Sequence, residues 1–252
     1  MQAVAIIPAR YSSTRFPGKP LVKIGSKTMI QRVYEAAKSV TSLADVIVAT
    51  DDERIATHVR SFGGNVVMTA ASHRSGTERC AEVVSTLTAS PDVVLNVQGD
   101  VPFISPEHLR QVLNCFDQEG TQIATLIKKI DDLVTLDNPN IPKVVLDNRM
   151  RALYFSRSPI PYRRDTEKEH WHQGFHYFKH IGIYGYRSDV LQEIIKLPQG
   201  KLELAEDLEQ LRWLEYDYAI QLAETTTESV AIDTPEDLSR VLGKMEGNKY
   251  LD

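Results

Sequence analysis

The chain has 252 residues, of which 42% are apolar and 25% are charged, a composition typical of a globular protein that can bury a full core. Its formal net charge of −5 argues against unspecific binding to nucleic acid or to an anionic membrane, so any basic patch must be local. The two cysteines do not indicate a disulfide framework, and no Cys/His metal spacing is present. Because we find neither a signal peptide nor an apolar run of about 20 residues, we expect a cytoplasmic protein without membrane insertion.

Apolar runs and amphipathic segments alternate through the first hundred residues. The run AVAIIPA at 3–9 indicates a strand that is buried on both faces. Further strands are predicted at 45–51, 65–70 and 92–100, and helices at 28–40, 53–63 and 75–87, the last with Ser75 or Thr77 as its cap. This alternation is typical of βαβ units and a mostly parallel sheet.

The second half of the chain follows no such alternation. Strand-like runs occupy 143–147, 152–156 and 180–186, and a long polar loop is predicted at 162–178, between the last two. A strongly patterned helix is predicted at 202–215, then a strand at 218–224 and a helix at 234–245. We therefore predict one domain over 1–252 of the α/β class, with a Rossmann-like mixed, mostly parallel sheet flanked by helices. A smaller, irregular β-rich subdomain is expected at about 130–187.

A basic loop follows the first predicted strand in the stretch IIPARYSSTRFPGKPL at 6–21. It carries Arg10, Arg15 and Lys19, hydroxyl groups at 12–14, and Gly18, which allows close backbone approach. Parallel sheets bind ligands at the carboxyl ends of their strands, where this loop and the pair 99–100 both fall. The loop matches a polyphosphate in sign and rough size, although neither GxxxxGK[ST] nor GxGxxG is present. A solvated basic turn is the alternative interpretation.

The loop, read as IPARYSSTRFPGKPL, resembles the signature of the sugar-nucleotide cytidylyltransferases, and within them the enzymes that act on 3-deoxy-manno-octulosonate (Kdo). Eight further blocks match in order: VATDDERI (48–55), SGTER (75–79), NVQGD (96–100), KVVLD (143–147), ALYFSRSPIP (152–161), HIGIYGYR (180–187), LEQLRWLE (208–215) and IDTPEDL (232–238). The resemblance implies the nucleotide-diphospho-sugar transferase type of fold. It also implies the reaction of CTP with Kdo to CMP-Kdo and pyrophosphate, a step toward lipopolysaccharide, with Mg²⁺ and a homodimer whose contacts and sugar site involve the predicted subdomain.

The resemblance also assigns roles around the nucleotide. The CTP phosphates would be held by Arg10, Ser13, Arg15 and Lys19, and the last two would stabilise the leaving pyrophosphate. The remaining nucleotide contacts implied are Ser75, Gly76, Thr77 and Gly99.

Asp100 and Asp233 would bind Mg²⁺, which prefers hard oxygen ligands. Their positions in the sequence do not show that the two carboxylates meet. Asp100 could instead be a turn residue after a glycine, and Asp233 a helix N-cap.

The residues implied for the sugar are Gln98, Arg157, His180, Tyr184, Glu209 and Gln210. Five of them also have a structural interpretation: sheet packing for His180 and Tyr184, a salt bridge for Arg157, a surface position for Glu209 and packing against a neighbour for Gln210. Strand alternation places His180 and Tyr184 on one side of their strand. Glu209 and Gln210 are neighbours on a helix, so both reach one ligand only if the helix presents its end or side broadly.

One residue departs from the family pattern. The family usually reads QGDEP where this chain has QGDVP, so that Val101 replaces an acid. The departure puts the tuning of the metal site or the sugar preference in doubt, so the same reaction on 8-amino-Kdo or another acid sugar and a catalytically impaired nucleotide-binding homologue stay open. A glycosyltransferase of similar topology is a further alternative, although that class typically carries a DxD motif where this strand ends in QGD. His170 and His172 are most simply explained by a solvated loop, and no transition metal is expected.

Overall fold

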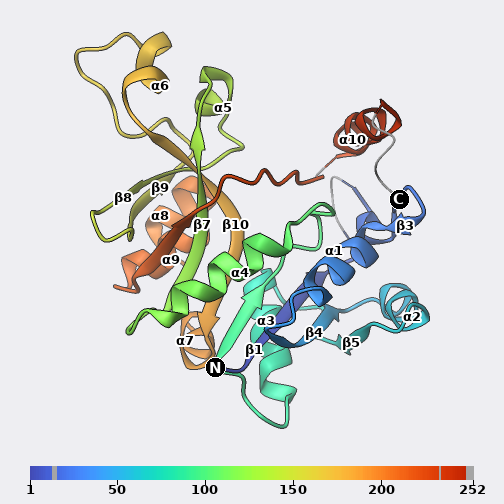
Figure 1. Ribbon diagram of the computed structural model, residues 1–252. Coiled ribbons are helices and arrows are strands. Elements are labelled where there is room, and N and C mark those ends of the chain that lie inside the picture. The colour runs from blue at the N-terminus through green and yellow to red at the C-terminus, as the bar shows by residue number, and fades with distance from the viewer. Residues whose placement is uncertain (13–15, 233, 248–252) are drawn as a thin grey trace. The chain divides into compact units, whose positions relative to one another are not determined.

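The computed structural model describes residues 1–12, 16–232 and 234–247 of the chain. It divides into two compact units, of which the first comprises residues 1–110 with the segment from 229 onward, and the second comprises Gln111–Glu228. Each unit has its own strands and helices (Figure 1). Within the described ranges, no helix is long and apolar enough to cross a bilayer.

The first unit contains a parallel sheet in the order β6–β1–β4–β5. Its strands are β1 (Ala3–Ala9), β4 (Leu43–Thr50), β5 (Asn65–Met68) and β6 (Val93–Asn96). Ala9 pairs with Thr50, and Ile6 pairs with Asn96, the last residue of β6. The segments that follow β1, β4 and β6 therefore leave the sheet at one edge, the carboxyl edge at which such sheets bind ligands.

Three helices pack against this sheet: α1 (Met29–Lys38), α2 (Glu53–Ser61) and α3 (Gly76–Thr86). Each begins at a side chain that accepts a hydrogen bond from a backbone N–H of the first turn, namely Thr28, Asp52 and Ser75. These positions confirm the predicted helices and Ser75 as the cap of the third. The unit also contains the short elements η1 (Lys19–Leu21), β2 (Lys23–Ile24) and β3 (Lys27–Thr28).

The last helix, α10 (Pro235–Gly247), also belongs to the first unit. Thr234 Oγ1 accepts from the Asp237 N–H at 3.2 Å, and the Asp237 carboxylate accepts from the Thr234 N–H at 3.1 Å. This reciprocal pair makes Thr234 the N-cap. Leu238 packs on a buried cluster that contains Ile24 and Ile232.

The second unit is built around a mixed sheet. The central strand β7 (Ile123–Ile130) pairs in parallel with β11 (Ile220–Glu224) and antiparallel with β10 (Tyr177–Arg187). Strand β8 (Lys143–Leu146) pairs antiparallel with β10, and β9 (Ala152–Ser156) pairs antiparallel with β8. The predicted class, a mixed and mostly parallel α/β sheet flanked by helices, is confirmed. Among the elements that the sequence analysis did not single out are α4 (Pro106–Asn114), η2 (Cys115–Asp117), β7, α5 (Leu133–Asp137) and α7 (Ser188–Ile194).

The prediction of one helix over 202–215 is wrong. Two short helices, α8 (Lys201–Glu206) and α9 (Gln210–Glu215), stand there instead. Asp207 interrupts them with φ of 52°, in the left-handed region that short polar side chains tolerate. The apolar periodicity continues across this break because both helices bury residues, so periodicity alone does not reveal the turn.

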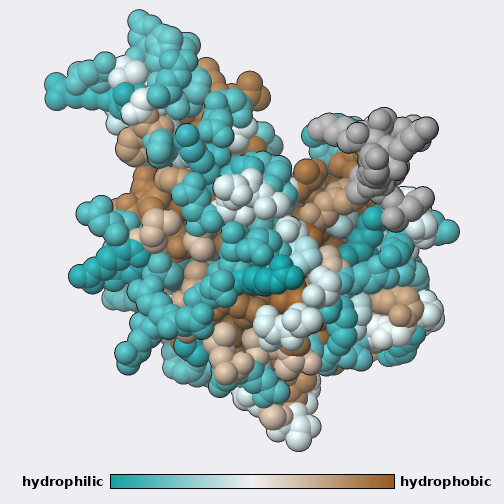
Figure 2. Space-filling model, in the orientation of Figure 1, coloured by the Kyte–Doolittle hydropathy of each residue, from teal (hydrophilic) through white to brown (hydrophobic). Residues whose placement is uncertain are grey.

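The long loop predicted over 162–178 is interrupted by short helices. The segment contains η3 (Lys168–His170) and α6 (Trp171–Gly174), and β10 begins at Tyr177. Trp171 and Tyr177 are buried in a small cluster with Ile130 and Leu136, which brings α6 against α5. Figure 2 shows mostly hydrophilic residues around α6 on the visible face, and the exposed aromatic side chains of Tyr162 and Phe175 pack against this cluster. Aromatic side chains buried by tertiary packing decided the local structure here.

Candidate active site

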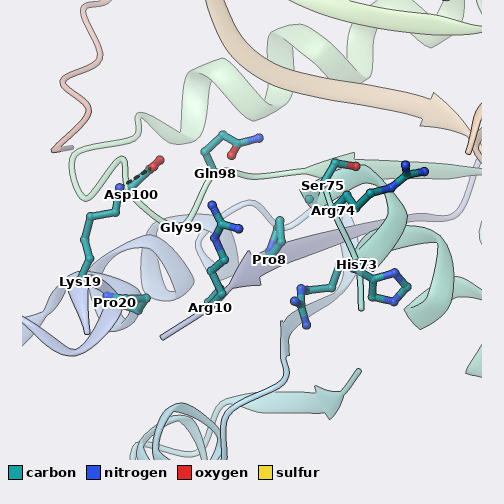
Figure 3. Close-up of a pocket in the computed structure, with 13 residues that line it drawn as sticks. Pro8, Arg10, Lys19, Pro20, His73, Arg74, Ser75, Gln98, Gly99 and Asp100 are labelled. Atoms are coloured by element: carbon teal, nitrogen blue, oxygen red, sulfur yellow. Dashed lines mark hydrogen bonds and ion pairs between the residues drawn. The ribbon is translucent and has the colours of Figure 1, made fainter. Parts of the chain in front are cut away.

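A pocket opens at the carboxyl edge of the parallel sheet in the first unit (Figure 3). It is lined by the end of β1 at 8–10, the start of η1 at 19–20, the segment 73–76 with Arg79, and the turn 98–100 after β6. In the view of Figure 3, Arg10 lies between the Lys19–Asp100 pair on one side and His73, Arg74 and Ser75 on the other. The strand ends thus bring together residues that are far apart in the sequence.

The pocket carries more positive than negative charge. Lys19 Nζ lies 2.8 Å from Asp100 Oδ2, the only carboxylate among the described lining residues. Arg74 and Arg79 lie 3.5 Å from Glu78 and Asp51, respectively, neither of which lines the pocket. Arg10 is exposed and has no ion-pair partner within the described part of the chain. An excess of positive charge around one carboxylate suits a polyphosphate with a metal ion.

The loop between β1 and η1 is closed by Tyr11. Its carbonyl accepts from the N–H of Gly18 at 2.9 Å, and Gly18 adopts φ of 72°. A Cβ at Gly18 would come within 3.0 Å of the Tyr11 ring, so both the conformation and the contact require glycine. On α2, the guanidinium of Arg54 lies 3.3 Å from the Tyr11 ring centroid. Ser13 and Arg15, two predicted phosphate contacts, lie outside the described residues.

The N-terminus of α3 forms one wall of the pocket. Ser75 accepts from the Glu78 N–H at 3.2 Å, and both Ser75 and Gly76 line the pocket. A Cβ at Gly76 would come within 3.0 Å of Pro8 Cγ, so glycine allows α3 to approach β1 closely. The positive end of the α3 dipole therefore faces the pocket. Thr77 is buried beneath this turn and is not among the lining residues.

The turn 99–101 packs tightly on β1. A Cβ at Gly99 would come within 3.0 Å of the Pro8 carbonyl oxygen, so only glycine fits without a backbone shift. Asp100 follows with its side chain partly exposed to the pocket. Val101, the departure from the family pattern, is 9% exposed and belongs to the buried apolar residues, so a valine suits its surroundings.

The chain returns to Asp100 from the far end of the sequence. The Ile232 N–H donates to the Asp100 carbonyl at 2.9 Å, and Ile232 is fully buried. Asp233, the second predicted metal ligand, lies outside the described residues. The next residue, Thr234, is the N-cap of α10. The sequence did not predict this contact, because it joins residues far apart along the chain and depends on the packing of Ile232.

Four of the predicted sugar residues come together in the second unit. The rings of His180 and Tyr184 lie 5.2 Å apart, and the charge of Glu209 contributes to raising the pKa of Tyr184. Glu209 is the N-cap of α9 and Gln210 its first residue, so the helix presents its end. Regular alternation would put residues i and i+4 about 13 Å apart. A register shift between Ile181 and Tyr184 breaks that spacing.

This cluster contains buried polar atoms without partners among the described residues. They are Tyr184 Oη, Gln210 Nε2 and the indole nitrogen of Trp213. Trp213 packs edge-on against Tyr184 with ring centroids 5.0 Å apart. The sequence analysis missed Trp213, whose helical spacing on α9 indicated only a core position. Buried donors are normally satisfied, so these three suit a ligand with many acceptor oxygens.

Burial sets the protonation of two members of the cluster. Desolvation lowers the pKa of His180 to about 3, so its imidazole is neutral near pH 7. Its Nε2 lies 3.0 Å from Thr125 Oγ1. Desolvation raises the pKa of Tyr184 well above its ordinary value, with a smaller contribution from Glu209, so this phenol keeps its proton.

The guanidinium of Arg157, another residue predicted for the sugar, donates to backbone carbonyls. Its Nε donates to the Glu206 carbonyl at 2.6 Å, Nη1 to the Pro139 carbonyl at 3.0 Å and Nη2 to the Asp207 carbonyl at 3.1 Å. These bonds hold the turn between α8 and α9, which carries Glu209. Gln98 belongs to the first unit, where it lines the cationic pocket with Nε2 3.5 Å from Asn96 Oδ1.

A cationic pocket at the carboxyl edge of a parallel sheet defines an α/β protein that binds an anionic nucleotide. Comparison with known proteins gives the family. The cytidylyltransferase family model matches residues 4–226. The 3-deoxy-manno-octulosonate cytidylyltransferase of Phocaeicola vulgatus is 54% identical over 95% of this chain and 96% of its own, and that of Geobacter sulfurreducens is 45% identical over 98% and 100%.

Solved structures agree. A CMP:2-keto-3-deoxy-manno-octonic acid synthetase complexed with CTP superposes with a TM-score of 0.90, at 42% identity over 98% of this chain and 99% of that one. A 4-diphosphocytidyl-2C-methyl-D-erythritol synthase from Anaerococcus prevotii, at 14% identity and a TM-score of 0.63, shares the fold alone. The chain belongs to the cytidylyltransferase family, and it is a nucleotidyltransferase.

Proposed function

We propose that the protein transfers the cytidylyl group of CTP to Kdo and releases pyrophosphate. The observation that carries the proposal is the pocket of the first unit, in which Lys19 faces Asp100 among three arginines. The relatives at about 54% identity bear the name of this activity, and the similar solved structure contains CTP.

The cations of the pocket bind the triphosphate and stabilise the leaving group. Arg10 and Lys19 hold the phosphates, together with Ser13 and Arg15 from the same loop. When the anomeric hydroxyl of the sugar attacks the α-phosphorus in line, negative charge accumulates on the departing pyrophosphate. Lys19 and Arg15 stabilise that charge electrostatically, because a fixed cation in a partly desolvated pocket needs no reorganisation during the reaction. No covalent intermediate with the enzyme is required.

The nucleoside is bound by the start of α3 and the turn after β6. Ser75 and Gly76 offer backbone groups and a hydroxyl at the positive end of α3, which suits the base and the adjoining phosphate, and Thr77 contributes by supporting this turn from beneath. Gly99 keeps the opposite turn close to β1, so the space between the two walls stays open.

Asp100 and Asp233 are the proposed ligands of Mg²⁺. The donor set fits, because Asp100 presents a carboxylate to an otherwise cationic pocket and Ile232 ties the segment before Asp233 to it. Magnesium prefers one or two carboxylates with phosphate and water as its other ligands. When bound, the ion would neutralise phosphate charge and lower the pKa of the attacking hydroxyl.

The sugar is bound by Gln98, Arg157, His180, Tyr184, Glu209 and Gln210, in this proposal. The support comes from the unpartnered Tyr184 Oη and Gln210 Nε2, which suit the hydroxyls and the carboxylate of an acid sugar. Arg157 contributes through the turn that it holds rather than through a free guanidinium. We further propose that the protein acts in the cytoplasm, supplies lipopolysaccharide synthesis and forms a homodimer through residues of about 130–187.

The test is pyrophosphate release in the presence of CTP, Mg²⁺ and Kdo, with Asp100→Ala measured in parallel. We expect release that requires all three components and is lost in the variant. Turnover with 8-amino-Kdo but not Kdo would reassign the sugar. Tight CTP binding without pyrophosphate release for any acid sugar would identify a nucleotide-binding homologue and contradict the proposal.

A further inference from the structure

The segment 69–75, which joins β5 to α3, has no strand or helix of its own, yet its last residues line the nucleotide pocket. Backbone groups in such a segment need partners outside a ladder or a helix. Here most of these partners come from a single helix, α3.

Two carboxylates one turn apart on α3 bind the segment. The Glu82 carboxylate accepts from the Ala70 N–H at 2.9 Å and also bonds to His73 Nε2. The Glu78 carboxylate accepts from the Arg74 N–H at 2.8 Å. Residues i and i+4 share a helix face, so the two carboxylates present a row of acceptors to the segment.

The other end of the segment is fixed as well. The Thr69 N–H donates to the Thr50 carbonyl at 2.8 Å, and the buried Arg79 guanidinium bonds to Thr69 Oγ1 while lying 3.5 Å from Asp51. Because charge-assisted hydrogen bonds are stronger than neutral ones, these contacts give the pocket wall one preferred shape.

Glu82 and Glu78 differ in their relation to the pocket. Glu78 donates its N–H to the Ser75 cap and pairs with Arg74, so its replacement would disturb the helix start itself. Glu82 lies further along α3 and does not line the pocket, although His73, which it contacts, does. The His73 contact and the Ala70 N–H hold the pKa of Glu82 below its usual value, as expected for a carboxylate that stays charged.

We propose that Glu82 is a positioning residue for nucleotide binding, which acts through His73 and the Ala70 N–H to hold the segment 69–75 in the shape that receives the nucleoside of CTP. The inference rests on the proposed function, because it takes the pocket to be the CTP site. It adds a residue that touches neither the phosphates nor the metal. Glu82 preorganises the wall, so its removal weakens nucleotide binding through the ordering that the ligand must then supply.

The test compares Glu82→Ala and Glu82→Gln with the control Glu107→Ala. Glu107 is also a glutamate on a helix of the first unit, and it forms an exposed ion pair with Arg110 away from the pocket. The dissociation constant of CTP is measured by calorimetry without sugar, and kcat and KM are measured for CTP, UTP and Kdo. We expect Glu82→Ala to raise the dissociation constant and the KM of CTP about tenfold, with a lower preference for CTP over UTP. kcat and the KM of Kdo should stay near wild type, because the variant loses binding energy that CTP gains equally in the ground state and in the transition state.

The variant Glu82→Gln keeps an acceptor for the Ala70 N–H and should show a smaller effect. In a His73→Ala background, Glu82→Ala should add much less than it does alone, because one of the two routes is already removed. Unchanged CTP affinity and unchanged CTP/UTP preference in Glu82→Ala would overturn the inference, as would losses that only follow a lower folded fraction. A wild-type protein that binds no CTP would overturn the proposed function itself and this inference with it.

Discussion

The ammonium of Lys19 lies 2.8 Å from Oδ2 of Asp100, although 81 positions separate the two residues. Both side chains are partly buried at the edge of the pocket, where their attraction is less screened than on an open surface. In this arrangement the cation occupies an oxygen that the proposed metal ion would use. Lys19 and Mg²⁺ are therefore expected to compete for Asp100 until the phosphates of CTP attract the lysine.

Replacing Lys19 should strengthen the binding of the metal ion and slow turnover of the nucleotide. Lys19→Met should bind Mn²⁺ more tightly than wild type without nucleotide, because the competing ammonium is gone. The same variant should lose about 100-fold in turnover, since a preorganised charge at the leaving group is missing. Electron paramagnetic resonance of Mn²⁺ and pyrophosphate release are the two measurements. Lys38→Met removes an exposed lysine of α1 as the control, and weaker Mn²⁺ binding in Lys19→Met would contradict the competition.

The close approach of Gly99 to β1 predicts a sharp difference between two glycines. Gly99→Ala should destabilise the protein by about 1–3 kcal/mol and weaken CTP binding, because its Cβ would meet the Pro8 carbonyl oxygen at 3.0 Å. Gly243→Ala, on α10 with nothing within 4 Å of the added Cβ, should be neutral or stabilising by up to about 1 kcal/mol. Urea unfolding and CTP calorimetry distinguish them. Equal effects at the two sites would show that the contact at Gly99 is unimportant.

Ile232 should couple the stability of the fold to the metal requirement. Ile232→Ala leaves a cavity beside Ile24 and Met29 and should destabilise the protein by about 2–4 kcal/mol. Because the Ile232 N–H holds the Asp100 carbonyl, the variant should also need more Mg²⁺ for half-maximal activity. Ile194→Ala, at a fully buried position on α7, should lose similar stability without that shift. The same Mg²⁺ requirement in both variants would refute the coupling.

The cation–π contact of Arg54 with Tyr11 should stabilise the loop after β1, whose cations are proposed to bind the phosphates. Arg54 also makes two side-chain hydrogen bonds to Asp52, at 2.9 and 2.6 Å, which help to hold its guanidinium over the ring. Arg54→Ala should raise the KM of CTP by about twofold to fivefold, since a cation–π contact at an exposed site is weak. Arg60→Ala removes an exposed arginine of the same helix, paired with Glu53, and should leave kinetics unchanged. If both variants behave alike, the cation–π contact has no role in nucleotide binding.

The buried His180 should make the protein sensitive to acid. Its pKa is about 3 in the folded state against about 6.5 in the unfolded chain, so between these values the unfolded chain binds more protons. The contribution of His180 to the free energy of unfolding is therefore fully present above pH 6.5 and is lost as the pH falls toward 3. At pH 5 the loss is about 2 kcal/mol. His180→Phe should show a flatter dependence of unfolding free energy on pH between 7 and 4.5. A slope equal to that of wild type would mean that His180 does not titrate as its burial requires.

Local patterns predicted much of the first unit. The apolar run of β1, the alternation up to β6 and the Ser75 cap all appear in the structure where periodicity and capping chemistry indicated them. They were predictable because each depends on residues within one turn or one strand. The break at Asp207 and the helix at Trp171 were not, because a left-handed residue and a buried indole depend on neighbours distant in sequence.

By itself the sequence determined the class of fold, the cationic loop at the end of β1 and the family, because these depend on local composition and on ordered motifs. Only the tertiary structure showed that Lys19 pairs with Asp100, that the Ile232 N–H donates to the Asp100 carbonyl and that the Glu82 carboxylate accepts from the Ala70 N–H. It also showed that Arg157 binds three backbone carbonyls. Such contacts join residues whose separation along the chain carries no information about distance, and strand register and side-chain packing decide which of them meet.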